Sequence, residues 1–158
     1  MTDVRIGIIG GGLMGRELAA VCGRWLHLVD HPVRPSVVAV ADLNPAALDW
    51  FRQVPTIETL TDSWQQLVDD ASLDVLYIAV PHNAHEEIYT AAAAAGKDFL
   101  AEKPFGIDLG SAERIASAID TAGVFVRVSS EMPFFPGALR AYELARSGAL
   151  GDIIEVRS

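Results

Sequence analysis

A glycine-rich turn that directly follows an apolar run is the feature that most constrains this chain. Residues 4–9 suit a buried parallel strand, and residues 10–15 read Gly-Gly-Gly-Leu-Met-Gly before a segment of helical composition. Strand, glycine turn and helix in this order are what a dinucleotide site requires. The first glycine allows the tight turn, the second lets backbone approach a pyrophosphate, and the third lets the helix pack close to the strand. The alternative is a purely structural turn. On the first interpretation the phosphates meet the backbone at Gly10, Gly12, Leu13, Met14 and Gly15.

A second apolar run, residues 37–41, ends on an acidic residue, Asp42. A carboxylate at the tip of a second strand accepts hydrogen bonds from the adenosine ribose and repels a 2′-phosphate, so we expect NAD rather than NADP. Asp42 follows Gly10 by 32 residues, against a usual spacing of about 20. The proline-containing segment 27–36 accounts for the surplus as an extended loop. Alternatively, Asp42 only adds negative charge beside the helix start at residues 44–45.

Composition narrows the function classes. The chain has 158 residues, of which 51% are hydrophobic and 21% charged, as expected of a globular domain with a full core. Its net charge of −9 argues against nucleic-acid or anionic-membrane partners. The single cysteine, Cys22, lies in a helical stretch and reads as a buried structural thiol. No leader and no apolar run of about 18 residues is present, so we expect a cytoplasmic protein. We predict no metal site.

Strand and helix candidates alternate along the chain, which predicts an α/β fold: a doubly wound, mainly parallel sheet with helices on both faces. The predicted strands are residues 4–9, 37–41, 56–60, 74–80, 98–101, 124–129 and 152–157. The predicted helices are residues 13–24, 45–54, 63–70, 83–95, 109–122 and 136–147. Several helix ends carry expected capping residues, namely Asn44, Asp62 with Gln65 as a capping box, Asp108, Gly96 and Gly123.

Polar residues and two prolines stand where several predicted strands end. Because ligands of open parallel sheets bind beyond the carboxyl ends of the strands, we expect these residues to share one crevice with the glycine turn. They are Pro81, His82, Asn83, His85, Glu102, Lys103, Pro104, Ser129, Ser130 and Glu131. The two histidines have an alternative interpretation as ordinary residues at a helix terminus.

Glu102 and Lys103 carry the chemistry of this group. Glu102 can accept hydrogen bonds from a ribose. Lys103 can place a positive charge beside a substrate oxygen, which lowers the cost of an alkoxide as hydride leaves the adjacent carbon. The alternative is a solvated charge pair of little energetic value. Pro104 stiffens the chain directly after Lys103, where a mobile surface pair would need no stiffening.

These motifs together resemble the glucose–fructose oxidoreductase, inositol dehydrogenase and rhizopine-catabolism family (Gfo/Idh/MocA). The resemblance spans nearly the whole chain. It rests on the glycine motif with Asp42, the spacing Pro81-x-x-x-His85, Ala-Glu-Lys-Pro-Phe at 101–105 and Ser-Gly-Ala-Leu-Gly-Asp at 147–152. Among these pieces, Glu-Lys-Pro after a strand, in register with the glycine motif, is the specific one.

The resemblance implies an NAD(P)-dependent dehydrogenase that transfers hydride between nicotinamide and a sugar, cyclitol or related polyol. It implies that Lys103 lies at the nicotinamide and substrate as the catalytic residue, that Glu102 binds the nicotinamide ribose, and that the Lys103–Pro104 bond is often cis. It also implies a Rossmann domain at residues 1–150, with residues 151–158 beginning a mostly β substrate domain that this chain lacks. We therefore expect an N-terminal fragment that binds coenzyme without turnover, and a homo-oligomer for the full-length protein.

One departure from the family pattern concerns the segment after the sixth predicted strand. Family members commonly have an arginine ahead of Phe-x-Pro, and here Pro133 occupies that position, with Glu131 nearby. The alternative function is thus a dinucleotide-binding sensor or scaffold without chemistry. An S-adenosylmethionine site is a further alternative, because methyltransferases also place an acidic residue after a glycine turn. The three-glycine spacing and the Glu-Lys-Pro triplet argue against it.

Overall fold

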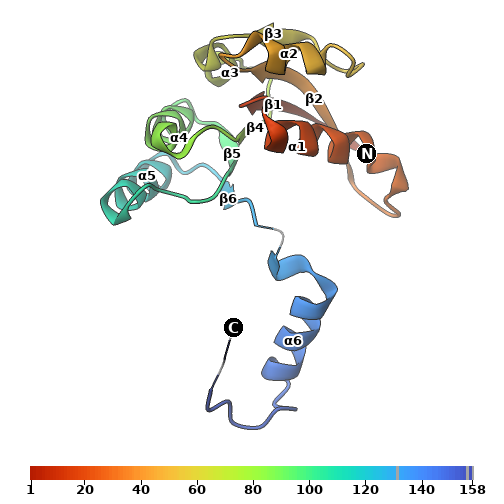
Figure 1. Ribbon diagram of the computed structural model, residues 1–158, viewed down its shortest axis with the longest axis vertical. Coiled ribbons are helices and arrows are strands. Elements are labelled where there is room, and N and C mark those ends of the chain that lie inside the picture. The colour runs from red at the N-terminus through yellow and green to blue at the C-terminus, as the bar shows by residue number, and fades with distance from the viewer. Residues whose placement is uncertain (131, 156, 158) are drawn as a thin grey trace.

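The computed structural model describes residues 1–130, 132–155 and 157, and its centre is a parallel sheet of six strands (Figure 1). The spatial order is β3-β2-β1-β4-β5-β6. Strands β2 and β3 are therefore added on one side of β1, and strands β4 to β6 on its other side. This order is that of a doubly wound dinucleotide-binding fold, whose ligand crevice lies where the two sides meet, between β1 and β4. The strands are β1 (Thr2–Ile9), β2 (Val33–Ala41), β3 (Thr59–Thr61), β4 (Val75–Ile78), β5 (Asp98–Ala101) and β6 (Val126–Val128).

Two apolar clusters cover the two faces of the sheet. Alternate strand residues face opposite sides, and each side meets its own set of helices. One face packs on α1 (Leu13–Gly23) and α2 (Pro45–Phe51), and the other packs on α3 (Trp64–Asp69), α4 (His85–Ala94) and α5 (Leu109–Ala122). Helices on both faces confirm the predicted fold class. Short 3-10 helices precede or follow these elements at η1 (Trp25–His27), η2 (His82–Ala84) and η3 (Met132–Phe134).

Capping residues explain where several helices begin and end. The Asn44 side chain accepts a 3.0 Å hydrogen bond from the amide of Ala46, and Asp108 accepts one of 2.7 Å from Ser111. Gly123 ends α5 in the left-handed conformation that glycine adopts freely. The predicted capping box at Asp62 is wrong: Ser63 is the N-cap of α3 and makes no side-chain cap bond.

The structure also corrects the limits of several elements. The segment 27–36 is not a single extended loop, because β2 already begins at Val33 and pairs with β1. Pro35 is tolerated inside β2 because β3 covers only the last three residues of that strand, which leaves one side of Pro35 open. The predicted third strand lies three residues later than expected at its start, at Thr59. The predicted fourth helix begins with the separate turn η2 before α4.

The carboxyl-terminal part stands apart from the sheet. The last helix, α6 (Pro136–Arg146), has no buried residue and is set away from the other helices (Figure 1). The strand predicted over residues 152–157 is wrong for 152–155 and 157, which form no strand, while Val156 lies outside the described residues. A half-buried strand needs a neighbour to supply its ladder bonds, and no described strand lies beside this segment. No helix in the described chain combines the length and apolarity that crossing a membrane requires.

Candidate dinucleotide site

The glycine turn between β1 and α1 has the close contacts that its sequence predicts. Gly10 has φ +105°, and a Cβ built there would lie 2.3 Å from the carbonyl oxygen of Ala79. A Cβ on Gly15 would lie 2.2 Å from the carbonyl oxygen of Gly10, so only glycine lets α1 start this close to the turn. Around Gly12, in contrast, nothing lies within 4 Å of such a Cβ. Gly10 and Gly15 are therefore required by close internal packing, whereas Gly12 borders open space.

The first turn of α1 faces this open space with unsatisfied backbone donors. Gly12 is the N-cap of α1 and makes no side-chain cap bond, and no acidic residue lies in the first turn. The amides of Leu13 and Met14 belong to the first turn, where an α-helix offers no internal acceptor. Leu13 is 74% exposed and Met14 is 43% exposed. Free amides at the positive end of a helix form a suitable cradle for a phosphate.

Asp42 lies at the end of β2 beside the glycine turn. Its Oδ2 accepts a 2.7 Å hydrogen bond from the amide of Gly11, and its Oδ1 accepts one of 2.7 Å from the amide of Asn44. The carboxylate is thus fixed in position by two backbone donors. A carboxylate has about four acceptor positions, so both oxygens keep capacity for a ligand. The alternative interpretation, a charge near the start of α2, describes the Asn44 contact but not the Gly11 contact.

A cavity of about 670 Å³ joins these elements at the carboxyl ends of β1, β2 and β4. Of the predicted site residues, Gly10, Gly12, Asp42, Pro81 and Asn83 line it. Sequence reasoning missed several further lining residues that follow strand ends or begin helices. They are Leu43, Asn44, Asp62, Trp64, Ala79, Val80, Ala84, Glu87 and Ile88. Trp64 and Ile88 give the cavity apolar walls, which suits the flat face of a base.

Glu102 lies beyond β5 and is buried, with 5% exposure. Its Oε1 accepts a 2.6 Å hydrogen bond from the hydroxyl of Tyr77, and its Oε2 accepts one of 3.1 Å from the amide of Lys103. The hydroxyl of Tyr89 donates to the carbonyl oxygen of Glu102 at 3.0 Å. These contacts exclude the alternative in which Glu102 and Lys103 form a solvated charge pair.

Lys103 points its charge outward from the same turn. Its side chain is exposed and forms no ion pair with the described residues. The Lys103–Pro104 peptide bond is cis, in agreement with the resemblance. Glu102 and Lys103 do not line the 670 Å³ cavity, so the structure places them at a neighbouring strand end rather than at the glycine turn itself.

The two predicted histidines differ sharply in their surroundings. His82 is exposed in η2, whereas His85 is 1% exposed and packs its ring on Tyr89 with centroids 4.7 Å apart. Both ring nitrogens of His85 contact backbone carbonyl oxygens, at Pro104 and Val80. Neither histidine lines the 670 Å³ cavity. A direct contact of either histidine with a coenzyme stays a prediction.

The segment after β6 contributes a separate cavity of about 620 Å³. Ser129, Ser130, Pro133 and Phe134 line it, together with Arg127 of β6. Glu131 lies outside the described residues. Pro133 stands where the resemblance leads us to expect an arginine, and Arg127 lines the same cavity.

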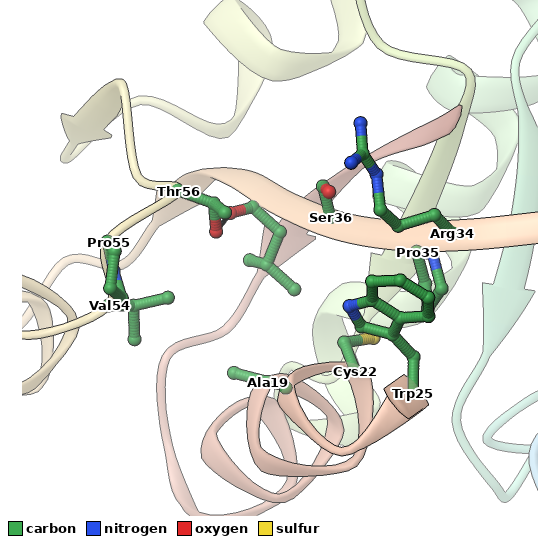
Figure 2. A pocket seen from close by; sticks show the side chains of 11 residues that line it. Ala19, Cys22, Trp25, Arg34, Pro35, Ser36, Val54, Pro55 and Thr56 are labelled. Carbon is green, nitrogen blue, oxygen red and sulfur yellow. Dashed lines mark hydrogen bonds between the residues drawn. The ribbon is translucent and has the colours of Figure 1, made fainter. Parts of the chain in front are cut away.

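A third cavity, of about 470 Å³, lies away from the carboxyl ends of the strands (Figure 2). Figure 2 shows Cys22 and Trp25 reaching from the end of α1 and from η1 toward Arg34 and Pro35 on the early part of β2. None of the predicted site residues lines it. Burial raises the pKa of the Cys22 thiol to about 11, which fits the prediction of an unreactive structural cysteine.

Comparisons with known proteins place the chain among NAD-binding oxidoreductases. Residues 4–130 match the family model described as an oxidoreductase family with an NAD-binding Rossmann fold. Levoglucosan dehydrogenase of Pseudarthrobacter phenanthrenivorans is 28% identical over 158 residues, which cover 99% of this chain and 40% of that protein. Trans-1,2-dihydrobenzene-1,2-diol dehydrogenase of Mus musculus is 30% identical over 155 residues, covering 98% of this chain and 45% of the relative.

A solved structure shows the same similarity in three dimensions. The structure of a levoglucosan dehydrogenase in complex with NADH and L-sorbose superposes with a TM-score of 0.89 at 28% identity, covering 97% of this chain and 41% of that one. This chain therefore spans less than half the length of the relatives that it matches.

Proposed function

Because this chain belongs to the Gfo/Idh/MocA oxidoreductase family, we propose that it holds the NAD of a dehydrogenase acting on a sugar, cyclitol or related polyol. One observation carries the proposal. The open backbone at Gly12 and the carboxylate of Asp42 border the same 670 Å³ cavity, and the amide of Gly11 joins them by its hydrogen bond to Asp42. A phosphate cradle and a ribose acceptor thus lie together as a dinucleotide requires.

The coenzyme supplies the hydride chemistry when it is bound. The residues that hold it are the glycine turn with Leu13 and Met14 for the phosphates and Asp42 for the adenosine ribose. Pro81, His82 and Asn83 follow β4 and lie in place for the middle of the dinucleotide. Glu102 is held in a fixed orientation for the nicotinamide ribose by Tyr77, and NADP is disfavoured by the charge of Asp42.

Lys103 is the proposed catalytic residue. Its free positive charge stabilises negative charge on a substrate oxygen as hydride leaves the neighbouring carbon. The walls of the polyol site belong to a substrate domain that we propose to follow residue 150, and its boundary, like the homo-oligomeric state and the cytoplasmic location, stays a prediction.

The decisive experiment compares two alanine variants at glycines that have free space. A Cβ meets nothing within 4 Å at either Gly12 or Gly23, so neither substitution is expected to disturb the fold. Calorimetric titration with NAD⁺ and NADH should show at least a tenfold loss of affinity for Gly12→Ala and none for the control Gly23→Ala. Equal affinity of both variants and the unmodified protein would contradict a dinucleotide at this turn.

A non-catalytic dinucleotide-binding module is the second candidate. It is favoured by Pro133, which stands where an arginine is expected. Both candidates predict coenzyme binding, so they differ only in turnover. Absorbance of reduced nicotinamide, followed in the intact protein with a panel of polyols, separates them: reduction of NAD⁺ by any of these supports the dehydrogenase.

A further inference from the structure

The 670 Å³ cavity extends beyond Asp42 to the end of the neighbouring strand. β3 pairs with β2 at the edge of the sheet, and the amide of Asp42 donates a 3.1 Å hydrogen bond to the carbonyl oxygen of Thr61, the last residue of β3. Asp62 follows directly and lines the cavity together with Asp42. Two carboxylates therefore border this cavity from the ends of two paired strands, and the proposed function uses only the first.

The order of the strands decides which part of a dinucleotide comes near Asp62. In the proposed function the phosphates lie at the glycine turn after β1, and the adenosine ribose lies at Asp42 after β2. Because Oδ2 of Asp42 accepts from the amide of Gly11, this carboxylate is turned toward the glycine turn. The next group along the coenzyme is the adenine base. In the spatial order β1, β2, β3 it extends outward from Asp42, toward the end of β3.

The apolar walls of the cavity suit the faces of a base but not its edge. Trp64, at the start of α3, is partly buried, and Ile88 of α4 is buried. Val80 and Ala84 add aliphatic surface to the same cavity. A flat ring gains burial against such walls, whereas its polar edge needs a hydrogen-bond partner. Adenine presents at that edge an exocyclic N6 amino group, which donates.

The Asp62 carboxylate is available as the acceptor. Its neighbours in the cavity wall use their side chains locally: Asn44 accepts from the amide of Ala46, and Thr61 accepts from the amide of Ser63. Asp62 itself is exposed and forms no ion pair with the described residues. Glu87 also lines the cavity, but it belongs to α4, which follows β4 on the other side of β1.

We propose that Asp62 is a specificity-determining residue and that its carboxylate accepts a hydrogen bond from the N6 amino group of adenine. The assignment rests on the proposed function and deepens it, because it names the base that the site selects. Hypoxanthine has a carbonyl oxygen at C6 in place of the amino group, so an acceptor would face the carboxylate. A site built to accept from the base therefore disfavours a hypoxanthine dinucleotide.

Calorimetric titration with NAD⁺ and with nicotinamide hypoxanthine dinucleotide tests the assignment. The two coenzymes differ only in the purine, so the ratio of their affinities isolates the contact with the base edge. We expect the unmodified protein to bind NAD⁺ about tenfold more tightly, as one hydrogen bond to a charged acceptor provides at an exposed site. Asp62→Asn presents an amide that can accept from an amino group or donate to a carbonyl oxygen. Its affinity ratio should therefore fall to about one.

Asp69→Asn is the matched control. It removes the same charge at the other end of α3, where Asp69 is exposed and does not line the cavity, and it should keep the tenfold ratio. An equal fall in Asp69→Asn would mean that net charge alone sets the ratio, which overturns the contact. A ratio near tenfold in Asp62→Asn, or near one in the unmodified protein, overturns the assignment and leaves the dinucleotide site standing. Binding of neither dinucleotide overturns the proposed function and the assignment together.

Discussion

The hydroxyl of Tyr77 donates a 2.6 Å hydrogen bond to Oε1 of Glu102 in the buried part of the sheet. Tyr77 pairs with Leu100 on β5, and Glu102 lies two residues beyond Leu100, so it projects from the same face as its diagonal neighbour. Burial, followed by the hydrogen bond to Glu102, raises the pKa of Tyr77 well above its ordinary value. Tyr77 thus stays a proton donor and keeps the Glu102 carboxylate in one orientation.

Replacing Tyr77 with phenylalanine should weaken both stability and coenzyme binding. The ring shape is retained, but the buried Glu102 oxygen loses its donor, which costs about 1–3 kcal/mol. Urea unfolding measures the loss, and titration with NADH measures the accompanying fall in affinity. The matched control is Tyr142→Phe on α6, where the tyrosine is 62% exposed and the change should stay within about 0.5 kcal/mol. Equal stability of the two variants would contradict a structural role for the Tyr77 hydroxyl.

Stability should fall on the alkaline side because of two buried tyrosines. Burial raises the pKa of both Tyr77 and Tyr89 above the ordinary value, which is about 10. In the unfolded chain both hydroxyls lose their protons near that pH, whereas the folded chain retains them. The stability that these two protonated hydroxyls contribute is therefore fully present below about pH 10 and decreases as pH rises above that value. Melting temperatures recorded between about pH 8 and 11 should fall less steeply for Tyr77→Phe than for the unmodified protein; identical slopes would exclude Tyr77 as a source.

The charge of Asp42 should set the choice between NAD and NADP. Asp42→Asn removes the charge and keeps an oxygen acceptor, so the ratio of NAD⁺ to NADP⁺ affinity should fall by about tenfold. Asp42→Ala also removes both backbone contacts, at Gly11 and Asn44, and should weaken NAD⁺ binding further. The ratio is insensitive to a general loss of stability, which makes it the informative quantity. An unchanged ratio of NAD⁺ to NADP⁺ affinity in Asp42→Asn would contradict the proposal that the charge of Asp42 sets the preference for NAD.

Gly15 should tolerate no side chain. Alanine favours a helix over glycine by about 1 kcal/mol, but its Cβ would lie 2.2 Å from the carbonyl oxygen of Gly10. Relieving that overlap requires a shift of backbone, so we expect Gly15→Ala to lose about 3 kcal/mol or more in urea unfolding. Gly110→Ala in α5 is the control, because its nearest neighbour is the flexible end of Arg114 at 3.2 Å. It should be neutral or slightly stabilising, and a similar loss at both sites would contradict the packing argument.

Much of the fold could be predicted from the sequence because its signals are local. The caps at Asn44 and Asp108 and the positive-φ Gly123 each act within a few residues, and the structure has them where they were predicted. The apolar runs at 4–9 and 37–41 indicated strands, and both β1 and β2 end in consecutive buried residues. The start of β2 at Val33 could not be predicted, because pairing with β1 overrides the turn signal of two prolines.

The candidate site was only partly predictable, and for a different reason. The spacing of the glycines, with Asp42 at the end of the second apolar run, is enough to predict a dinucleotide site from the sequence alone. Tyr77 and His85, in contrast, owe their roles to neighbours 25 and 19 residues away, at Glu102 and Pro104. A tyrosine inside an apolar strand gives no sequence signal for a buried carboxylate partner. The predicted strand at 152–157 failed because alternation indicates a half-buried strand only where another strand is present to pair with it.

Lys103 should be required for turnover but not for coenzyme binding. Its side chain is exposed, while its backbone amide donates to the Glu102 carboxylate and the next residue, Pro104, contacts His85 through its carbonyl oxygen. Removing a preorganised charge beside a developing alkoxide lowers turnover by about 10²–10³-fold. Lys103→Ala in the intact protein should show that loss in the reduced-nicotinamide assay, with an NADH dissociation constant within about twofold of the original. Lys103→Arg keeps the charge but not the point geometry of the ammonium, so its turnover should lie between the two. Unchanged turnover in Lys103→Ala would remove Lys103 from the reaction, and lost NADH binding would reassign it to holding the coenzyme.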